Sequence, residues 1–335
     1  MHRFDKRKDF LYIGDGSDNT VKTFDADTGR FLGSFVVPDS NIHGPRGLIF
    51  DHGGNLLVTN QNLDQPQNGN VLRYNSQTGA FLGELVQSSA PGAPFAPRGI
   101  VLSKQNILFV ADMGDVDLPG ELRTYNGTTG MFLGNLNHSG FNGQFHPRGV
   151  VIGPDGFLYV SVRNLPQPLG GSVLRFNPKT GKFLGVFIES NTVNDLNRPE
   201  GLVFGPDGNL YITSFRSDES DTDKILIFDG DTGKFLDKIE LDVVGQPRAF
   251  AQALLFGPDG KLFVPITGDG PDTGTVRRYN IHHHHKSFDV FVPPASAGGP
   301  LGEPWYLTFG NTNPATLAYR RYRDEDTCES SDESS

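Results

Sequence analysis

The sequence predicts an all-β protein built from repeated units of four short antiparallel strands, and three observations support this fold class. First, 42 Gly and 23 Pro make up about one residue in five, against about 12% in an average protein, and a helical bundle does not tolerate that load. Second, two short motifs recur along nearly the whole chain. Third, the segments between them are short apolar runs bounded by Gly, Asn, Asp and Pro, a pattern typical of strands joined by tight turns.

The first motif reads aromatic–Asn/Asp–x–x–Thr–Gly–x–Phe–Leu, and consecutive copies are about 50 residues apart. Its five full copies span residues 24–32, 74–82, 125–133, 176–184 and 228–236. A sixth, degenerate copy lies at 279–288. The Thr-Gly pair supplies the positive-φ residue that a tight hairpin requires, so each copy is expected to join two antiparallel strands.

The second motif is Pro-x-Gly followed by three mostly apolar residues. It occurs at 45–50, 97–102, 147–152 and 199–204, with degenerate copies at 251–256 and 304–309. A turn and a further apolar strand follow it in the first five copies. Each repeat therefore contains four strands, and four antiparallel strands in 40–50 residues are the content of one propeller blade. The sequence predicts a β-propeller.

The two ends of the chain complete the number of blades. Five blades are expected within residues 45–88, 97–137, 147–189, 199–241 and 251–293. The sixth combines 304–310 with 9–37, and such closure removes an open sheet edge. Residues 316–322 also resemble a strand and compete for a place in this blade. We expect one six-bladed domain over residues 1–322, followed by an acidic, serine-rich, disordered tail at 323–335.

The composition excludes several classes of function. The formal net charge is −10, which argues against nucleic-acid binding because phosphate contacts need a basic face. No stretch approaches 18 apolar residues, so no membrane span is expected. Cys328 is the only cysteine and cannot form an internal disulfide. The first residues lack the apolar core of a signal peptide. The default expectation is a cytoplasmic monomer, or a secreted one if a signal was removed.

Together the two motifs resemble those of the six-bladed propeller superfamily of NHL-repeat proteins and streptogramin lyases. More distantly, they are similar to the regucalcin/gluconolactonase, paraoxonase and strictosidine synthase groups. The resemblance covers about residues 9–310. Because this architecture hosts lyases, lactonases, other hydrolases and binding modules, the resemblance implies a fold more than a function.

In that superfamily the residue between Pro and Gly faces the central channel. The resemblance places six side chains there: Arg46, Arg98, Arg148, Glu200, Gln252 and Trp305. Three arginines would repel a cation, which weighs against the Ca²⁺ site of metal-dependent members. They suit a carboxylate, phosphate or sulfate, which a guanidinium binds in fork geometry. The alternative is that they are paired with carboxylates near the same mouth, those of Asp15, Asp112 and Glu200.

The loops that join second to third strands open on the same face, and Arg163 begins one of them. Loops of this length over a rigid scaffold often carry ligand contacts. We expect an arginine-lined mouth that binds a small anionic molecule or an acidic peptide. The alternative is a lyase- or hydrolase-type enzyme in which Glu200, His43 or His146 acts as the acid or base.

Four consecutive histidines interrupt the sixth copy of the first motif: His282, His283, His284 and His285. Adjacent imidazoles bind Ni²⁺, Cu²⁺ or Zn²⁺, so a divalent metal is the one cofactor that the sequence suggests. The run lies in a turn on the face opposite the mouth, without the fixed geometry of a catalytic centre. Metal affinity there is expected to be incidental.

Overall fold

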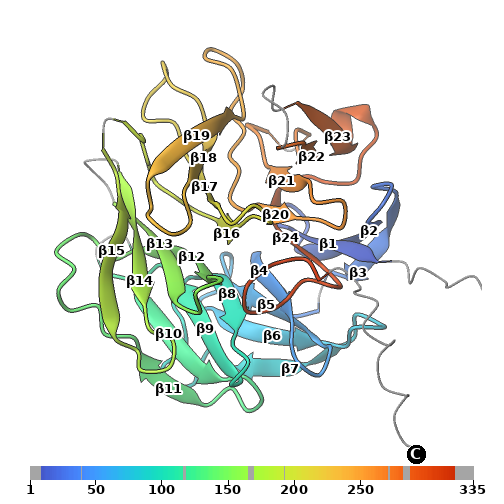
Figure 1. Ribbon diagram of the computed structural model, residues 1–335. Coiled ribbons are helices and arrows are strands. Elements are labelled where there is room, and N and C mark those ends of the chain that lie inside the picture. The colour runs from blue at the N-terminus through green and yellow to red at the C-terminus, as the bar shows by residue number, and fades with distance from the viewer. Residues whose placement is uncertain are drawn as a thin grey trace, which may run out of the picture.

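Six four-stranded antiparallel sheets surround a central axis in the computed structural model (Figure 1). The structure describes residues 9–38, 40–115, 118–164, 170–191, 193–270, 272–281 and 287–320. Within these ranges the only helix is the short 3₁₀-helix η1 (Ala295–Ala297), and none is long and apolar enough to cross a membrane. The predicted six-bladed propeller with four antiparallel strands per blade is confirmed.

The strands of each blade follow one another from the axis outwards. Blade 1 contains β4 (Pro45–Phe50), β5 (Leu56–Asn60), β6 (Asn70–Tyr74) and β7 (Phe81–Val86). Blade 2 contains β8 (Pro97–Leu102), β9 (Ile107–Asp112), β10 (Glu121–Asn126) and β11 (Phe132–Asn135). Blade 3 contains β12 (Pro147–Ile152), β13 (Leu158–Arg163), β14 (Gly171–Phe176) and β15 (Phe183–Glu189). Blade 4 contains β16 (Leu202–Phe204), β17 (Leu210–Ser214), β18 (Lys224–Phe228) and β19 (Phe235–Glu240). Blade 5 contains β20 (Leu255–Phe256), β21 (Leu262–Ile266), β22 (Thr275–Tyr279) and β23 (Phe288–Val292).

Blade 6 joins the two ends of the chain. Its order is β24 (Pro304–Phe309), β1 (Phe10–Asp15), β2 (Thr20–Asp25) and β3 (Phe31–Val36). In the antiparallel pair of β24 and β1, Ile13 lies opposite Leu307 and Leu11 opposite Phe309. The closure predicted from the repeats is therefore present. The edge of β24 that faces the rest of its blade is paired with β1.

The strand patterns follow from position in the blade. All five residues of β5 and of β17 are buried, because the second strand of a blade is covered on both faces by neighbouring blades. Such strands appear in the sequence as continuous apolar runs. Outer strands such as β7 are largely exposed at their first residues and buried at their last two. The hydrophobic core consequently forms a ring between blades.

The Asn/Asp and Gly residues of the first motif have distinct structural roles. Asn75 Oδ1 accepts hydrogen bonds from the backbone N–H groups of Gln77 and Thr78, at 2.9 and 3.0 Å. Gly79 has φ +69°, a conformation that favours glycine. A Cβ at Gly79 would also collide with the carbonyl oxygen of Phe35 in the preceding blade. The motif therefore forms the turn and also fits it against the neighbouring blade.

The Gly of the second motif lets inner strands approach one another around the axis. A Cβ at Gly99 would lie 2.8 Å from the carbonyl oxygen of Arg148, and one at Gly149 would lie 2.5 Å from that of Glu200. The backbone of each channel-facing residue thus packs on the glycine of the preceding blade. This packing brings residues that are about 50 positions apart into one layer.

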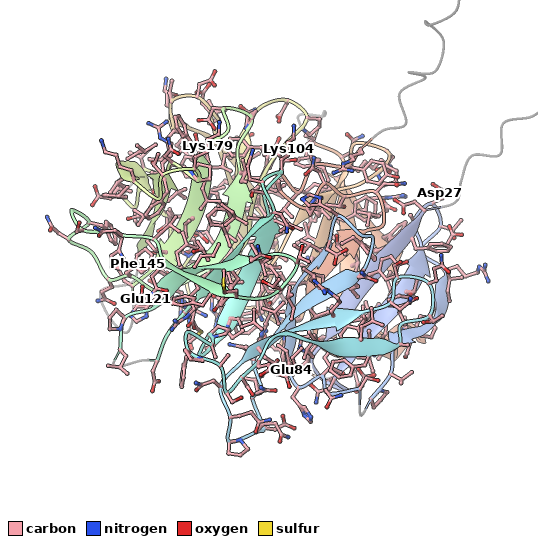
Figure 2. All side chains as sticks on the ribbon, turned by 90° about the horizontal axis from the view of Figure 1, so that it is seen from below. Asp27, Glu84, Lys104, Glu121, Phe145 and Lys179 are labelled. Carbon is pink, nitrogen blue, oxygen red and sulfur yellow. The ribbon has the colours of Figure 1, made fainter. Side chains whose placement is uncertain are left out.

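The propeller has two faces with different loops. We call the face where the inner strands begin the mouth face. Glu121 and Phe145 belong to it, whereas Asp27, Lys104 and Lys179 lie in turns on the opposite face, as Figure 2 shows.

The segment after β24 covers the axis on the face opposite the mouth, and the expectation of a strand at 316–322 is wrong for its described part. The carbonyl oxygens of Pro314 and Ala315 accept hydrogen bonds from the N–H groups of Leu102 and Ile152, at 2.8 and 3.0 Å. These two residues end the inner strands β8 and β12, whose last N–H groups require acceptors. β1 already occupies the position beside β24, so the segment forms turns over the axis. In its described part, up to residue 320, the β-pairing is an isolated bridge between residues 312 and 319.

Candidate functional site

The residues between Pro and Gly converge at the mouth end of the axis. Arg46 Nη1 and Arg98 Nη1 both donate to Gln252 Oε1, at 3.0 and 3.1 Å. These three residues belong to blades 1, 2 and 5. One side-chain oxygen therefore joins positions that are more than 150 residues apart. We call Arg46, Arg98, Arg148, Glu200, Gln252 and Trp305 the arginine layer.

Arg46 is held by neutral partners. Its guanidinium carbon lies 3.4 Å from the ring centre of Trp305, and its Nε donates to Gln61 Oε1 at 2.7 Å. Cation–π stacking and a neutral amide orient a guanidinium without cancelling its charge. Burial, and next to it the charge of Arg98, lowers the pKa of Arg46 well below its usual value. Among the described residues, the hydrogen-bond partners of its guanidinium are the neutral amides of Gln61 and Gln252.

Met113 provides a sulfur acceptor at the centre of the layer. Arg148 Nη1 lies 2.9 Å from its Sδ, and Arg98 Nε lies 3.4 Å from the same atom. A thioether is a weak acceptor without charge. Two guanidinium groups thus point at one position that an anionic oxygen would satisfy better.

Glu200 is the only carboxylate in the layer. Its Oε1 lies 2.6 Å from Arg163 Nη1 and 3.7 Å from Arg148 Nη1. Burial by itself would raise the pKa of the Glu200 carboxyl, but Arg148 and Arg163 more than offset burial and hold this pKa below its usual value. Glu200 is therefore ionised at neutral pH. A single negative charge faces four guanidinium groups, those of Arg46, Arg98, Arg148 and Arg163.

Several buried polar atoms of the site lack hydrogen-bond partners within the part of the chain that the structure describes. They are Nε and Nη2 of Arg148, Nε of Arg163, Oε2 of Glu200 and the hydroxyl of Tyr306. Buried polar atoms are normally satisfied by protein, water or a ligand. Arg148 is fully buried, so its two orphaned donors are the most costly of the set. These atoms could therefore donate hydrogen bonds to, or accept them from, water or a bound polar group.

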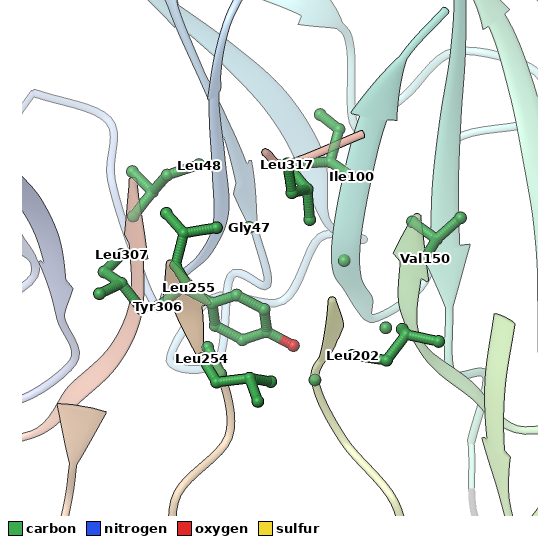
Figure 3. Close-up of a pocket in the computed structure, with 14 residues that line it drawn as sticks. Gly47, Leu48, Ile100, Val150, Leu202, Leu254, Leu255, Tyr306, Leu307 and Leu317 are labelled. Atoms are coloured by element: carbon green, nitrogen blue, oxygen red, sulfur yellow. The ribbon is translucent and has the colours of Figure 1, made fainter. Parts of the chain in front are cut away.

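A small cavity on the axis is lined by inner-strand residues. Its volume is about 40 Å³, and its lining includes Gly99, Gly149, Leu202, Tyr306 and Leu317. Figure 3 shows the Tyr306 hydroxyl directed into it. A space of this size admits water but no organic molecule. Leu317 comes from the segment that covers the axis opposite the mouth and lines the cavity from that side.

Two of the predicted binding residues, Asp15 and Asp112, make ion pairs and hydrogen bonds within the scaffold. Asp15 pairs with Lys22 at 2.7 Å and accepts the N–H groups of Gly302 and Glu303. Asp112 pairs with Arg123 at 2.6 Å and accepts the N–H groups of residues 95 and 96. Both carboxylates hold the loop that leads into an inner strand. The alternative in which they neutralise the arginines does not match these partners.

The predicted histidines lie at different places. His146 is buried, with Nδ1 3.0 Å from the carbonyl oxygen of Met113, and thus borders the arginine layer. His43 Nδ1 lies 3.0 Å from Asp64 in the 60–70 loop, with the His43 side chain about one-third exposed (32%). The run His282–His285 lies outside the described residues. Among those described, no group of three or more His, Cys, Asp or Glu is arranged to hold a metal ion.

Sequence reasoning did not select Met113 or Tyr306. The sequence does distinguish Tyr306, because this tyrosine occupies the position at which the other five blades have Gly or Ala. A tyrosine among small residues at the axis fills space that the glycines leave. Met113 directly follows β9 and carries no repeat signal, so its place between two arginines is visible only in three dimensions.

Comparisons with known proteins support the architecture. No protein-family model matches the chain, and no curated protein matches it. Hydrazine synthase from Kuenenia stuttgartiensis is similar at TM-score 0.56 and 18% identity, over 80% of this chain and 73% of that chain. A Bacteroides caccae protein of unknown function has TM-score 0.54 and 11% identity, over 81% and 90%. The PQQ-bound aldose sugar dehydrogenase of Streptomyces coelicolor has TM-score 0.50 and 16% identity, over 75% and 81%. At these identities the likeness shows the propeller fold alone and does not separate NHL-repeat proteins from streptogramin lyases.

Proposed function

We propose that the arginine layer binds the carboxylate, phosphate or sulfate group of a small molecule at the mouth of the propeller. The observation that carries this proposal is the fully buried Arg148, whose Nε and Nη2 have no acceptor among the described residues. Arg46 and Arg98 add charge, and their closest acceptors are amide oxygens and a sulfur. An anion with several oxygens would supply charged acceptors to this set.

The pKa of Glu200 and the hydrogen bond of His146 favour a binding function over acid–base catalysis. The lowered pKa of Glu200 makes it a poor proton donor and a weak base near neutral pH. His146 Nδ1 already contacts a carbonyl oxygen, so only its other ring nitrogen is available. A lyase or hydrolase activity at the same mouth is the alternative, and it would depend on His146 more than on Glu200.

One structural neighbour contains a cofactor that is itself an anion. The aldose sugar dehydrogenase is PQQ-bound. That likeness concerns the fold alone, at 16% identity. As an anion, PQQ belongs among the compounds to be screened for binding to the arginine layer.

The test is thermal unfolding in sodium sulfate and in sodium chloride at equal ionic strength, for the wild type and Arg98→Met. Sulfate stabilises any protein through exclusion from its surface, so the informative quantity is the difference between the two proteins. A ligand of the native state raises the free energy of unfolding with concentration. Arg98→Met should reduce the sulfate-specific part by about 1.5–3 kcal/mol, typical of a hydrogen bond to a charged group.

Arg175→Gln is the control, since Arg175 is an arginine of the strand β14, away from the layer, and lies over the rings of Phe157 and Phe187. Its sulfate response should equal that of the wild type. If Arg98→Met and Arg175→Gln respond alike, the arginine layer binds no anion and the proposal is wrong.

A further inference from the structure

A second group of arginines lies beside the arginine layer on the mouth face. Arg248 lies 3.8 Å from the ring centre of Phe250 and 5.5 Å from that of Phe215. Arg198 lies 5.8 Å from the ring centre of Phe215, and the two phenylalanine rings meet edge to face at 5.9 Å. Aromatic faces hold both guanidiniums in place without supplying a negative charge.

Only one of these two cations has a carboxylate partner within ion-pair distance among the described residues. Arg248 Nη2 pairs with Asp223 Oδ1 at 2.6 Å. Arg198 Nη2 instead donates to the carbonyl oxygen of Arg216, also at 2.6 Å. Arg198 Nε is buried and has no partner in the described part of the chain. Arg198 is therefore a partly buried cation with free donor capacity.

The backbone at this place is held in a conformation that bulky residues rarely adopt. Arg198 has φ +44° and Phe250 has φ +50°. They occupy equivalent positions, each two residues before a member of the arginine layer, Glu200 and Gln252. Left-handed conformations of such residues are costly and cluster at functional sites. Glycine would relieve this cost, as Gly44 does at the same position in blade 1, yet blades 4 and 5 have side chains there.

The charges of Arg198 and Arg248 add to those of the arginine layer. Burial, followed by the charges of Arg248 and Arg163, lowers the pKa of Arg198. Arg163 in turn contacts Glu200 of the arginine layer at 2.6 Å. Arg198 and Arg248 thus extend the cations of the arginine layer on a chain whose net charge is −10. Glu200 pairs with Arg163, and Asp223 pairs with Arg248. Such a concentration of one sign attracts ligands of the opposite charge.

We propose that Arg198, flanked by Phe215 and Arg163, forms a second anion subsite, and that the ligand is an organic dianion whose two acidic groups are separated by a short chain. One acidic group binds the arginine layer and the other binds Arg198. This inference rests on the proposed function, because it assigns the first acidic group to that layer. When the two acidic groups belong to one molecule, binding of the second group is intramolecular. The dianion therefore binds more tightly than two separate monoanions would.

The experiment measures the stabilisation of the protein by linear aliphatic dicarboxylates from succinate to suberate, each compared with the monocarboxylate of equal chain length at equal ionic strength. For the wild type, one chain length should stabilise at a concentration at least tenfold lower than its monocarboxylate. Arg198→Gln should lose this advantage and keep the monocarboxylate and sulfate responses. Arg198→Lys, which keeps the charge, should retain part of it. Arg175→Gln should behave as the wild type, and circular dichroism without ligand confirms that each variant folds.

The outcomes separate the two proposals. A wild type that responds to sulfate but equally to monocarboxylates and dicarboxylates of every length overturns the second subsite and leaves the first. An advantage that survives in Arg198→Gln also overturns it, because the second acidic group then binds elsewhere. A wild type without any response that depends on Arg98 overturns the proposed function itself.

Discussion

The guanidinium Nη1 of Arg148 lies 2.9 Å from the thioether sulfur of Met113, closer than its 3.7 Å to the nearest oxygen of Glu200. A fully buried cation therefore has an uncharged sulfur as its nearest acceptor. Since sulfur is a weak acceptor, this contact fills space without satisfying the donors. The position of the sulfur marks where a negatively charged oxygen would stabilise the site.

The first prediction replaces that sulfur by a carboxylate. Met113→Glu should raise the free energy of unfolding without ligand by about 1.5 kcal/mol, the lower end for hydrogen bonds to charged groups. It should also abolish the sulfate-specific stabilisation, because the new carboxylate would pair with Arg98 and Arg148 in place of the anion. Chemical denaturation with and without sulfate measures both quantities. Met113→Leu, with a similar shape and no acceptor, should keep the sulfate response, and a destabilised Met113→Glu would show that no anion position exists there.

The fold was predictable because each repeat carries its own local signals. Turn residues such as Asn75 and Gly79 act within a few residues of themselves, and the glycines that pack against the next blade recur with the same period. The segment at 316–320 was not predictable, because its apolar residues suit a strand equally well. The turn that precedes it is held by the N–H groups of Leu102 and Ile152, which donate to the carbonyl oxygens of Pro314 and Ala315 and lie far away in the sequence.

The site was predictable only in part. The repeat brought Arg46, Arg98 and Gln252 to one position, as the resemblance implied. Asp15 and Asp112 lie near the same mouth, but their carboxylates are taken by backbone N–H groups and by other cations. Repeat spacing places a Cα atom and leaves the direction of a side chain open. Partner choice among neighbouring charges therefore required the structure.

The second prediction concerns the close approach of inner strands. Gly149→Ala would place a Cβ 2.5 Å from the carbonyl oxygen of Glu200 and 2.6 Å from a methyl carbon of Leu202. Because the obstacle includes backbone of the next blade, the blades must move apart, and we expect a loss of about 1–3 kcal/mol, typical of an overpacked core. Thermal or chemical unfolding measures the loss. Gly270→Ala, with no atom within 4 Å of the added Cβ, should be near neutral; equal stability of both variants would contradict the proposed packing.

The third prediction is a pH dependence centred on Lys224, which is buried between two carboxylates. Its Nζ lies 2.6 Å from Asp195 and 2.6 Å from Asp221. Burial alone would raise the pKa of Asp221, but Lys224 and the backbone N–H groups of Ser217 and Thr222 lower it to about 2 from its usual 3.8. A lowered pKa means that the ionised carboxylate stabilises the native state above pH 3.8, and that this contribution is lost as the pH falls through about 2.

Stability measured from pH 5 to pH 2 should therefore decline more steeply in the wild type than in Lys224→Met. We expect the difference attributable to Asp221 to be about 1 kcal/mol, after allowing for screening of a partly exposed carboxylate. Lys224→Met should be less stable at pH 5, since it leaves two carboxylates without their cation. Parallel pH profiles for the two proteins would mean that the Lys224 pair does not contribute.

The last prediction concerns the closure of the ring by the chain ends. Deletion of residues 1–36 removes β1, β2 and β3, which leaves β24 without its partner and the adjacent faces of blades 1 and 5 uncovered. We expect insoluble or self-associated protein, because unpaired strands and apolar faces associate. Size-exclusion chromatography measures this outcome. A soluble, monomeric and cooperatively folded deletion variant would contradict closure as a requirement for folding.

Asp15→Asn gives a graded test of the same closure, since the full chain remains. Asp15 is fully buried, pairs with Lys22 and accepts N–H groups just before β24. The amide keeps one acceptor oxygen but leaves the buried Lys22 ammonium without this carboxylate, with Asp18 as its remaining partner. Breaking a buried pair costs about 3–5 kcal/mol when nothing replaces it; the half-exposed Asp18 should reduce that cost. If closure holds the ring together, Asp15→Asn should lower stability while the protein stays monomeric, and hydrogen exchange should increase first at β1 and β24. Faster exchange confined to blades 2 and 3 would show that the ring opens elsewhere.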